Sequence, residues 1–213
     1  MRKRTGVLIL VLGAVALMTF FVLLCRDPEP RYQGRSLSRW VIRYATPPRM
    51  SLSAEKDEAA DAIRHIGTNA VPYLLTWLRY EEPPGKRKRL DTVNKLLGWL
   101  NAQLGAAGSW TLKDQQGERA RGACLAFAAL GPEAKAAIPE LSRLLCAPNG
   151  TPGDAGAALA LANLADLGLP PLVAALTNAD AHVRVRAVFN MEHLGTNARP
   201  AVPMLINTMR DND

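Results

Sequence analysis

A short motif that recurs along the chain limits its fold more than any other feature of the sequence. In each copy an apolar stretch ends at a glycine, and a polar turn, a proline and further leucines follow it, although one copy is looser than the others. The copies begin at His65, Ala129, Asn163 and His193. The prolines Pro139, Pro170 and Pro203 follow one another at spacings of 31 and 33 residues. A fixed period of about 20–50 residues indicates an array of stacked structural repeats.

The residue types in the motif predict a pair of helices in each copy. A glycine after an apolar helical stretch adopts the left-handed conformation that ends a helix. A proline in the first turn of the next helix is tolerated because the amide there has no helical partner. Leucines at helical spacing, such as Leu141, Leu144 and Leu145, then form one apolar face. A single pair cannot bury such faces but stacked pairs can, so we expect an all-α fold.

Composition agrees with this expectation. Aromatic residues make up only 6% of the chain, and no long run alternates apolar and polar residues as a half-buried strand does. A β-sandwich or β-barrel is therefore not expected. The three cysteines are too few and too scattered for a small disulfide-built fold or for a paired zinc motif.

The motif resembles the HEAT-like repeat family, the type also found in phycobilisome-lyase-related proteins. Residues Asp180 to Ala187 are similar to that family's D-x-x-V-R-x-x-A opening of the first helix. The resemblance implies an α-solenoid of stacked helix–turn–helix repeats over residues 53–213. Pro72 and Pro139 are 67 residues apart, about two periods, so we expect a degenerate unit around Lys86 to Leu104.

The N-terminus has the pattern of a membrane anchor. A cationic segment, residues 1–6, precedes residues Val7 to Leu24, which carry no charge. As a helix these 18 residues span about 27 Å, close to the thickness of a bilayer core. We expect a transmembrane signal anchor with its N-terminus in the cytoplasm and the repeat domain outside. Cys25, directly after the apolar run, has two interpretations: the acceptor of a lipid in a cleaved signal, or a residue with no role.

Residues 25–52 form a juxtamembrane linker with a short amphipathic helix, Ser36 to Ala45. Its apolar side consists of Leu37, Trp40, Val41 and Tyr44. The basic residues Arg35, Arg39 and Arg43 lie on the opposite side. Such a helix is typical of a membrane interface. It is also suited to cover the exposed end of a repeat array, and we favour this second interpretation because a solenoid needs its end covered.

The densest basic run, Lys86, Arg87, Lys88 and Arg89, is the candidate site for contact with an anionic surface. The alternative is a solvated start of a helix. Residues 26–99 carry 14 basic and 9 acidic side chains, which adds only a weak positive field. Nucleic-acid binding would need a longer basic stripe with aromatic residues, so it is not expected.

No arrangement of residues predicts catalysis, and we expect no cofactor, no bound metal and no small-molecule partner. His65 and His193 occupy the same position in two different repeats, so they cannot share a metal ion. Cys124 and Cys146 could pair in an oxidising compartment, but Cys124 lies in an apolar stretch where a buried free thiol is expected.

The last repeat is not followed by a polar capping repeat. It should therefore expose apolar surface, which favours a partner, self-association or fraying, although a truncated reading frame would look the same. We predict a membrane-anchored scaffold or adaptor that binds another protein. The alternatives are a HEAT-like tetrapyrrole lyase or other enzyme, which the resemblance implies, and a binder of anionic surfaces through Lys86 to Arg89.

Overall fold

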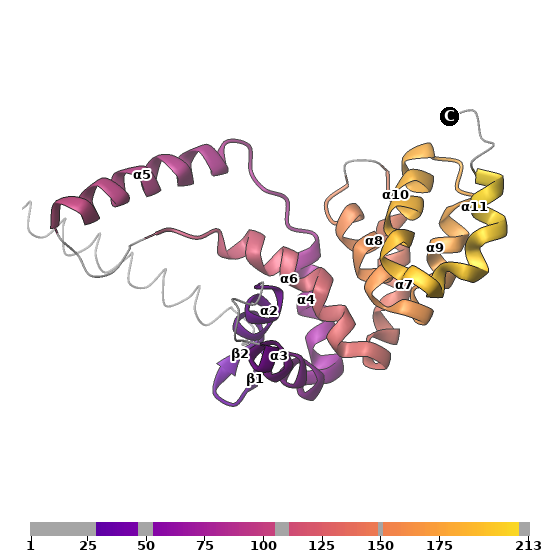
Figure 1. The fold of residues 1–213 in the computed structure, drawn as a ribbon, viewed down its shortest axis with the longest axis horizontal. Coiled ribbons are helices and arrows are strands. Elements are labelled where there is room, and N and C mark those ends of the chain that lie inside the picture. The colour runs from indigo at the N-terminus through magenta and orange to yellow at the C-terminus, as the bar shows by residue number, and fades with distance from the viewer. Residues whose placement is uncertain (1–28, 47–52, 105–110, 149–150, 209–213) are drawn as a thin grey trace, which may run out of the picture.

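The computed structural model describes residues 29–46, 53–104, 111–148 and 151–208, and most of them are helical (Figure 1). The prediction of an all-α fold is therefore confirmed. Two-residue strands, β1 (Arg31–Tyr32) and β2 (Arg35–Ser36), pair in antiparallel fashion before the first described helix. The predicted anchor, residues 7–24, and Cys25 lie outside the described residues. Among the helices that are described, none has the length and apolar character needed to cross a membrane.

Within the described residues, eight helices form four hairpins. In each, two α-helices are joined by a turn of 3-10 helix. The first hairpin is α3 (Ser53–Ile66), η1 (Gly67–Ala70) and α4 (Val71–Leu78), and the second is α6 (Gln115–Leu130), η2 (Gly131–Ala137) and α7 (Ile138–Leu145). The third is α8 (Asp154–Asn163), η3 (Ala165–Leu167) and α9 (Leu169–Ala175), and the fourth is α10 (Ala181–Met191), η4 (Glu192–Ala201) and α11 (Val202–Thr208).

The glycines predicted to end the first helix of a hairpin directly follow that helix in the first two hairpins, and in the fourth the glycine forms a kink within η4. Gly67, Gly131 and Gly195 have φ values of +58°, +55° and +55°. In the third hairpin the equivalent position, directly after Leu164, is held by Ala165 with φ +49°. Gly168, the glycine of this copy of the motif, follows η3 but does not adopt the predicted left-handed conformation. Its φ is −89°, and a Cβ there would lie 1.8 Å from the carbonyl oxygen of Leu161, so the residue is small because the backbone passes close by.

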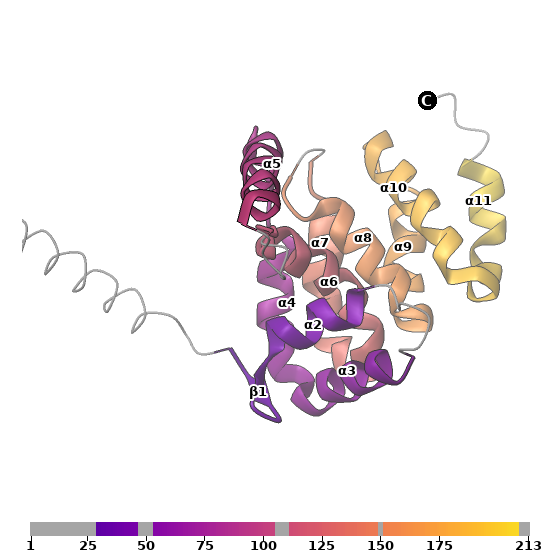
Figure 2. The ribbon, with the colours of Figure 1, turned by 60° about the vertical axis from the view of Figure 1, so that its left-hand side comes forward.

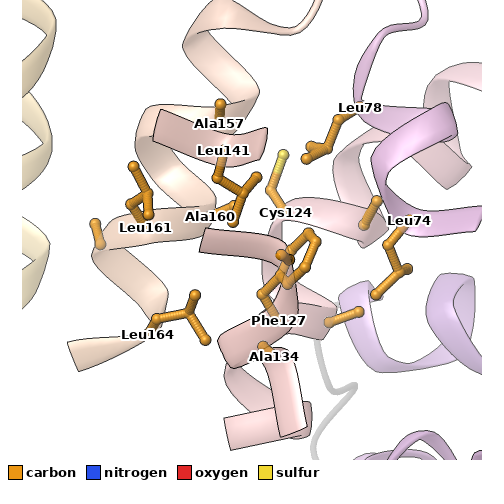
Figure 3. Close-up of a cluster of buried hydrophobic side chains, with 14 of the residues drawn as sticks. Leu74, Leu78, Cys124, Phe127, Ala134, Leu141, Ala157, Ala160, Leu161 and Leu164 are labelled. Carbon is orange, nitrogen blue, oxygen red and sulfur yellow. The ribbon is translucent and has the colours of Figure 1, made fainter. Parts of the chain in front are cut away.

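The hairpins pack against each other in chain order. Helix α4 packs on α6, α7 packs on α8, and α8 and α9 pack on α10. Figure 2 shows the helices side by side from α4 to α11. Leu74 of α4, Phe127 of α6, Leu141 of α7 and Leu161 of α8 are each fully buried and belong to one continuous core (Figure 3).

Helix α2 (Leu37–Ala45) covers α3 and α6, as expected for a cap rather than a membrane helix. Trp40 is 1% exposed, and its indole Nε1 donates a hydrogen bond to the carbonyl oxygen of Tyr32 at 3.1 Å. Arg43 of the basic side pairs with Glu58 of α3 at 3.1 Å. At Gly122 a Cβ would lie 2.9 Å from the carbonyl oxygen of Val41, so only glycine allows α6 to approach α2 this closely.

The prediction of a degenerate repeat around Lys86 to Leu104 is wrong. This segment is one helix, α5 (Lys86–Leu104), which projects from the packed hairpins (Figure 1). None of its described side chains is buried, and it makes no extensive contact with another element. Because α4 packs directly on α6, the first two hairpins are neighbours. The 67 residues between Pro72 and Pro139 include the projecting helix α5, and they do not form a further layer of the core.

Candidate interaction surfaces

The predicted basic run lies at the start of α5, and its first member differs from the others. The Lys86 ammonium donates hydrogen bonds to Asp114 Oδ1 at 2.7 Å and to the Tyr80 hydroxyl at 2.6 Å. Arg87, Lys88 and Arg89 are exposed. The candidate surface of four cations is therefore reduced to three, and Lys86 instead fastens the base of α5 to the segment that enters α6.

The Lys86–Asp114 pair is stabilised by several hydrogen bonds. The hydrogen bond to Asp114, and then that to Tyr80, raise the pKa of Lys86 above its usual value. Burial acts to raise the pKa of Asp114. Hydrogen bonds from Lys86 and from the backbone amides of Gly117 and Gln116 outweigh this effect, so the Asp114 pKa is lowered. Both groups are held in their charged forms. Asp114 also caps α6, because it accepts a hydrogen bond from the Gln116 amide at 3.2 Å.

A second feature of α5 was not predicted. Val93, Leu96 and Trp99 are 38%, 61% and 58% exposed, and they follow one another at intervals of three residues. The degenerate repeat expected around Lys86 to Leu104 would have buried such residues. The absence of a proline between them and the helix that begins at Gln115 was the available signal that no second helix of a hairpin would cover them.

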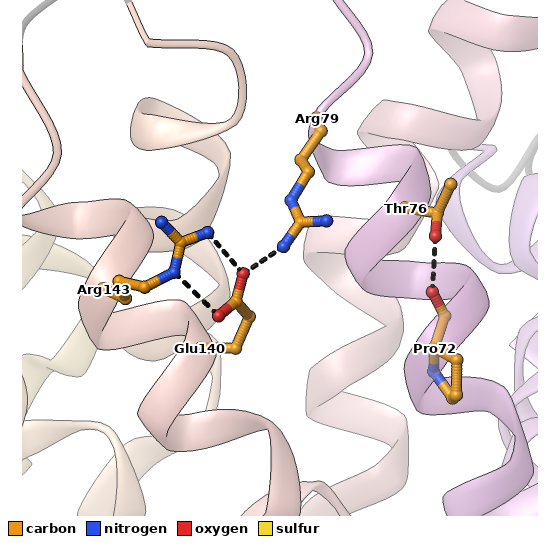
Figure 4. A network of polar contacts seen from close by, with 5 residues as sticks. All are labelled: Pro72, Thr76, Arg79, Glu140 and Arg143. Carbon is orange, nitrogen blue, oxygen red and sulfur yellow. Dashed lines mark hydrogen bonds and ion pairs between the residues drawn. The ribbon is translucent and has the colours of Figure 1, made fainter.

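A network of charged side chains joins the first two hairpins. Glu140 of α7 accepts hydrogen bonds from Arg143 at 2.7 and 2.9 Å and pairs with Arg79, which follows α4 (Figure 4). Arg143 first, and then Arg79, lower the pKa of Glu140 to about 2 against the opposing effect of burial. Carboxylate and guanidinium groups thus satisfy each other across a packed interface, which is a structural and not a catalytic arrangement.

The helices of the fourth hairpin expose a group of apolar side chains. On α10 these are Val185, Val188 and Phe189, which are 65%, 41% and 68% exposed. On α11 they are Val202 and Ile206, which are 47% and 49% exposed. We call these five residues the α10–α11 face. It corresponds to the exposed apolar surface predicted for the last repeat, although the sequence did not identify its members.

Earlier hairpins bury the position that Val188 occupies. It is the seventh residue before the left-handed residue, Gly195. The same position is Ala60 in the first hairpin, Cys124 in the second and Ala158 in the third, which are 7%, 7% and 0% exposed. Cys124 lies against α8, since a Cβ at Gly156 would be 3.5 Å from its Sγ. Val188 is thus exposed at a position that each earlier hairpin buries, whereas the residues equivalent to Val185, which are Asp57, Arg121 and Ala155, are exposed as well.

The remaining candidate groups are isolated from one another. Cys124 and Cys146 are both free, so they do not form the disulfide that was considered, and burial raises the pKa of the Cys124 thiol to about 11. His65 stacks on Tyr32 with ring centroids 4.7 Å apart, whereas His193 is exposed on η4. Among the described residues no three His, Cys, Asp or Glu side chains are grouped to hold a metal ion.

A hollow of about 410 Å³ lies between α2 and the start of α6. Its lining includes Ser38, Arg39, Lys113 and Arg119. Arg119 is engaged there, because it pairs with Glu29 at 3.7 Å and stacks over Trp77. Serine hydroxyls and cations can bind an anion, but the hollow contains neither a nucleophile paired with a base nor a set of metal ligands.

Comparison with known proteins gave no match to a family model, to a curated protein or to a solved structure. The fold therefore defines the class: an all-α protein built of helical hairpins that pack in chain order. The resemblance to the HEAT-like family remains a prediction.

Proposed function

We propose that this chain is a membrane-anchored α-solenoid of HEAT-like repeats that acts as a scaffold or adaptor. Residues 7–24 would form the anchor, with the N-terminus in the cytoplasm and the repeat domain, residues 53–213, outside. The recurring hairpins with a left-handed residue and an N-terminal proline support the solenoid. The anchor rests on its apolar sequence and its cationic flank.

One observation carries the scaffold function: the α10–α11 face exposes five apolar side chains, and one of them, Val188, holds a position that every earlier hairpin buries. A contiguous apolar patch on a protein surface marks a site of association, because its transfer from water is favourable. Phe189 and Val185 are the most exposed side chains of the α10–α11 face. A protein partner with an apolar helix surface would bury the Phe189 and Val185 side chains. Helices α8 and α10 of this chain bury each other's side chains in the same way.

The test is affinity purification of the full chain, solubilised from its native membrane, in two forms. The wild-type chain should retain a partner protein in stoichiometric amount. The double variant Val185→Ser and Phe189→Ser should lose it, while its far-ultraviolet circular dichroism stays unchanged, because both residues are exposed. The matched control is Glu133→Ser with Lys135→Ser, two exposed residues on η2, which should retain the partner.

Equal recovery of the same proteins by wild type and by the Val185/Phe189 variant would exclude the α10–α11 face as the binding surface. The alternative function is that of a tetrapyrrole lyase or another enzyme. Catalytic turnover in a substrate screen, together with no recovered partner, would favour that alternative over the scaffold.

A further inference from the structure

Polar contacts at the base of helix α5 and halfway along it attach this helix to the rest of the described molecule. Lys86 is fastened to Asp114 and Tyr80 as described above. Asn94 forms two hydrogen bonds with the returning chain: its Nδ2 donates to the carbonyl oxygen of Leu112 at 3.0 Å, and its Oδ1 accepts from the Leu112 amide at 2.7 Å. These contacts lie on the side of α5 that carries Leu90 and Leu97, both half-buried. Around the rest of the helix circumference the described side chains are exposed, so this side is open.

The open side of α5 carries a stripe of apolar residues. Val93, Leu96 and Trp99 fall within about a third of the helix circumference, because a step of three residues turns an α-helix by about 300°. Cations border this stripe. By the same helical geometry Arg89 lies within it, and Lys88 and Lys95 lie beside Trp99, whereas Arg87 points the opposite way. All four cations are exposed.

We propose that α5 lies on the surface of a bilayer that contains anionic lipids, with Val93, Leu96 and Trp99 inserted between the headgroups and the acyl chains. Lys88, Arg89 and Lys95 then contact lipid phosphates. An interfacial helix is built in this way, with Trp and Leu on the buried side and Lys and Arg at its edge. This inference is independent of the partner proposed for the α10–α11 face.

The chemistry of the stripe favours a bilayer over other occupants. Nucleic acid would satisfy the cations but would leave Val93 and Leu96 in water. Residues 7–24 of the same chain would cover the apolar side chains but carry no charge to meet Lys88, Arg89 and Lys95. An anionic bilayer supplies both an apolar phase and negative charge at its surface, and each cation near such a surface strengthens binding about fivefold.

The experiment uses the full chain with an environment-sensitive fluorophore on a cysteine at position 96. The labelled variant is Leu96→Cys in a background of Cys25→Ser and Cys146→Ser, in which Cys124 is buried from the reagent. The chain is reconstituted into vesicles of phosphatidylcholine alone or of phosphatidylcholine with phosphatidylglycerol. We expect a blue-shifted emission and quenching by brominated acyl chains in the anionic vesicles, and emission typical of water in the neutral ones. A label at Lys135→Cys should give emission typical of water in both.

Two charge variants form a matched pair, because each removes one exposed cation from the first turn of α5. Arg89→Gln should reduce the ratio of inserted to free helix about fivefold, whereas Arg87→Gln should change it little, since Arg87 faces away from the stripe. Trp99→Ser should also reduce insertion.

Three outcomes would overturn the proposal. The first is emission typical of water at position 96 in anionic vesicles. The second is equal protection of position 96 in neutral and anionic vesicles, which would indicate cover by residues 7–24 or by a second copy. The third is protection that appears only when single-stranded RNA is added to the vesicles.

Discussion

At the scale of single residues, the turn of each hairpin depends on one backbone angle. A positive φ is available to glycine without strain but costs an L-residue of the alanine type about 1–2 kcal/mol. Gly131 and Gly195 adopt it with no atom within 4 Å of where a Cβ would be, so only the backbone conformation selects glycine there. Ala165 adopts φ +49° in the third hairpin and therefore carries strain.

Substitutions at these positions should have opposite effects on stability. We expect Ala165→Gly to raise the free energy of unfolding by about 0.5 kcal/mol, because relief of strain exceeds the entropy that glycine loses on folding. Gly131→Ala should lower it by about 1–3 kcal/mol. Urea denaturation followed by circular dichroism measures both. A stabilising Gly131→Ala, or a strongly destabilising Ala165→Gly, would contradict this account of the turn.

At the scale of elements, local signals predicted the hairpins well. The leucines expected to form one apolar face, Leu141, Leu144 and Leu145, all lie on α7 and are all buried. The contacts between elements were not predictable, since they join residues far apart in the chain. Gly122 is small because Val41 passes close to it, and Glu140 meets Arg79 across 61 residues.

The Glu140 network should make the interface between the first two hairpins sensitive to acid. The pKa of Glu140 is lowered from 4.5 to about 2 in the folded chain, so its stabilising effect is complete above about pH 4.5 and is lost as the pH falls towards 2. We expect Glu140→Gln to lower the free energy of unfolding by about 1 kcal/mol at neutral pH, the upper range for a partly exposed ion pair.

Urea denaturation as a function of pH tests this expectation. The difference in stability between wild type and Glu140→Gln should shrink from pH 4.5 downwards and vanish near pH 2. Glu133→Gln, which changes an exposed carboxylate on η2, serves as the control and should differ little from wild type at any pH. A constant difference across this range would show that Glu140 acts through packing and not through its charge.

At the scale of the whole molecule, the described core runs through the four hairpins and α2 and leaves α5 out. Replacement of residues 87–112 by a short glycine–serine linker should therefore keep the fold, because the side chains of Lys86 and Asp114 meet, with Nζ and Oδ1 2.7 Å apart, and so bring the two ends of the segment together. We expect a loss of helical signal that corresponds to α5 and a shift of less than about 4 °C in the unfolding temperature, equivalent to under about 1 kcal/mol.

Leu141→Ala provides the comparison for this deletion. Leu141 is fully buried between hairpins, so its truncation should cost about 2–5 kcal/mol. If removal of residues 87–112 destabilised the chain as much as Leu141→Ala, α5 would be part of the core after all.

The sequence by itself determined the helical class, the starts and ends of most hairpin helices and the capping role of α2. These features follow from glycine, proline and apolar spacing within about 30 residues of chain, and such local preferences act before distant segments meet. Only the tertiary structure decided that α5 is an excursion and that Lys86 pairs with Asp114. It also decided that the α10–α11 face stays open. The physical reason is that burial depends on which surfaces come together, and the spacing of a motif is the same whether the intervening helix is packed or projects into solvent.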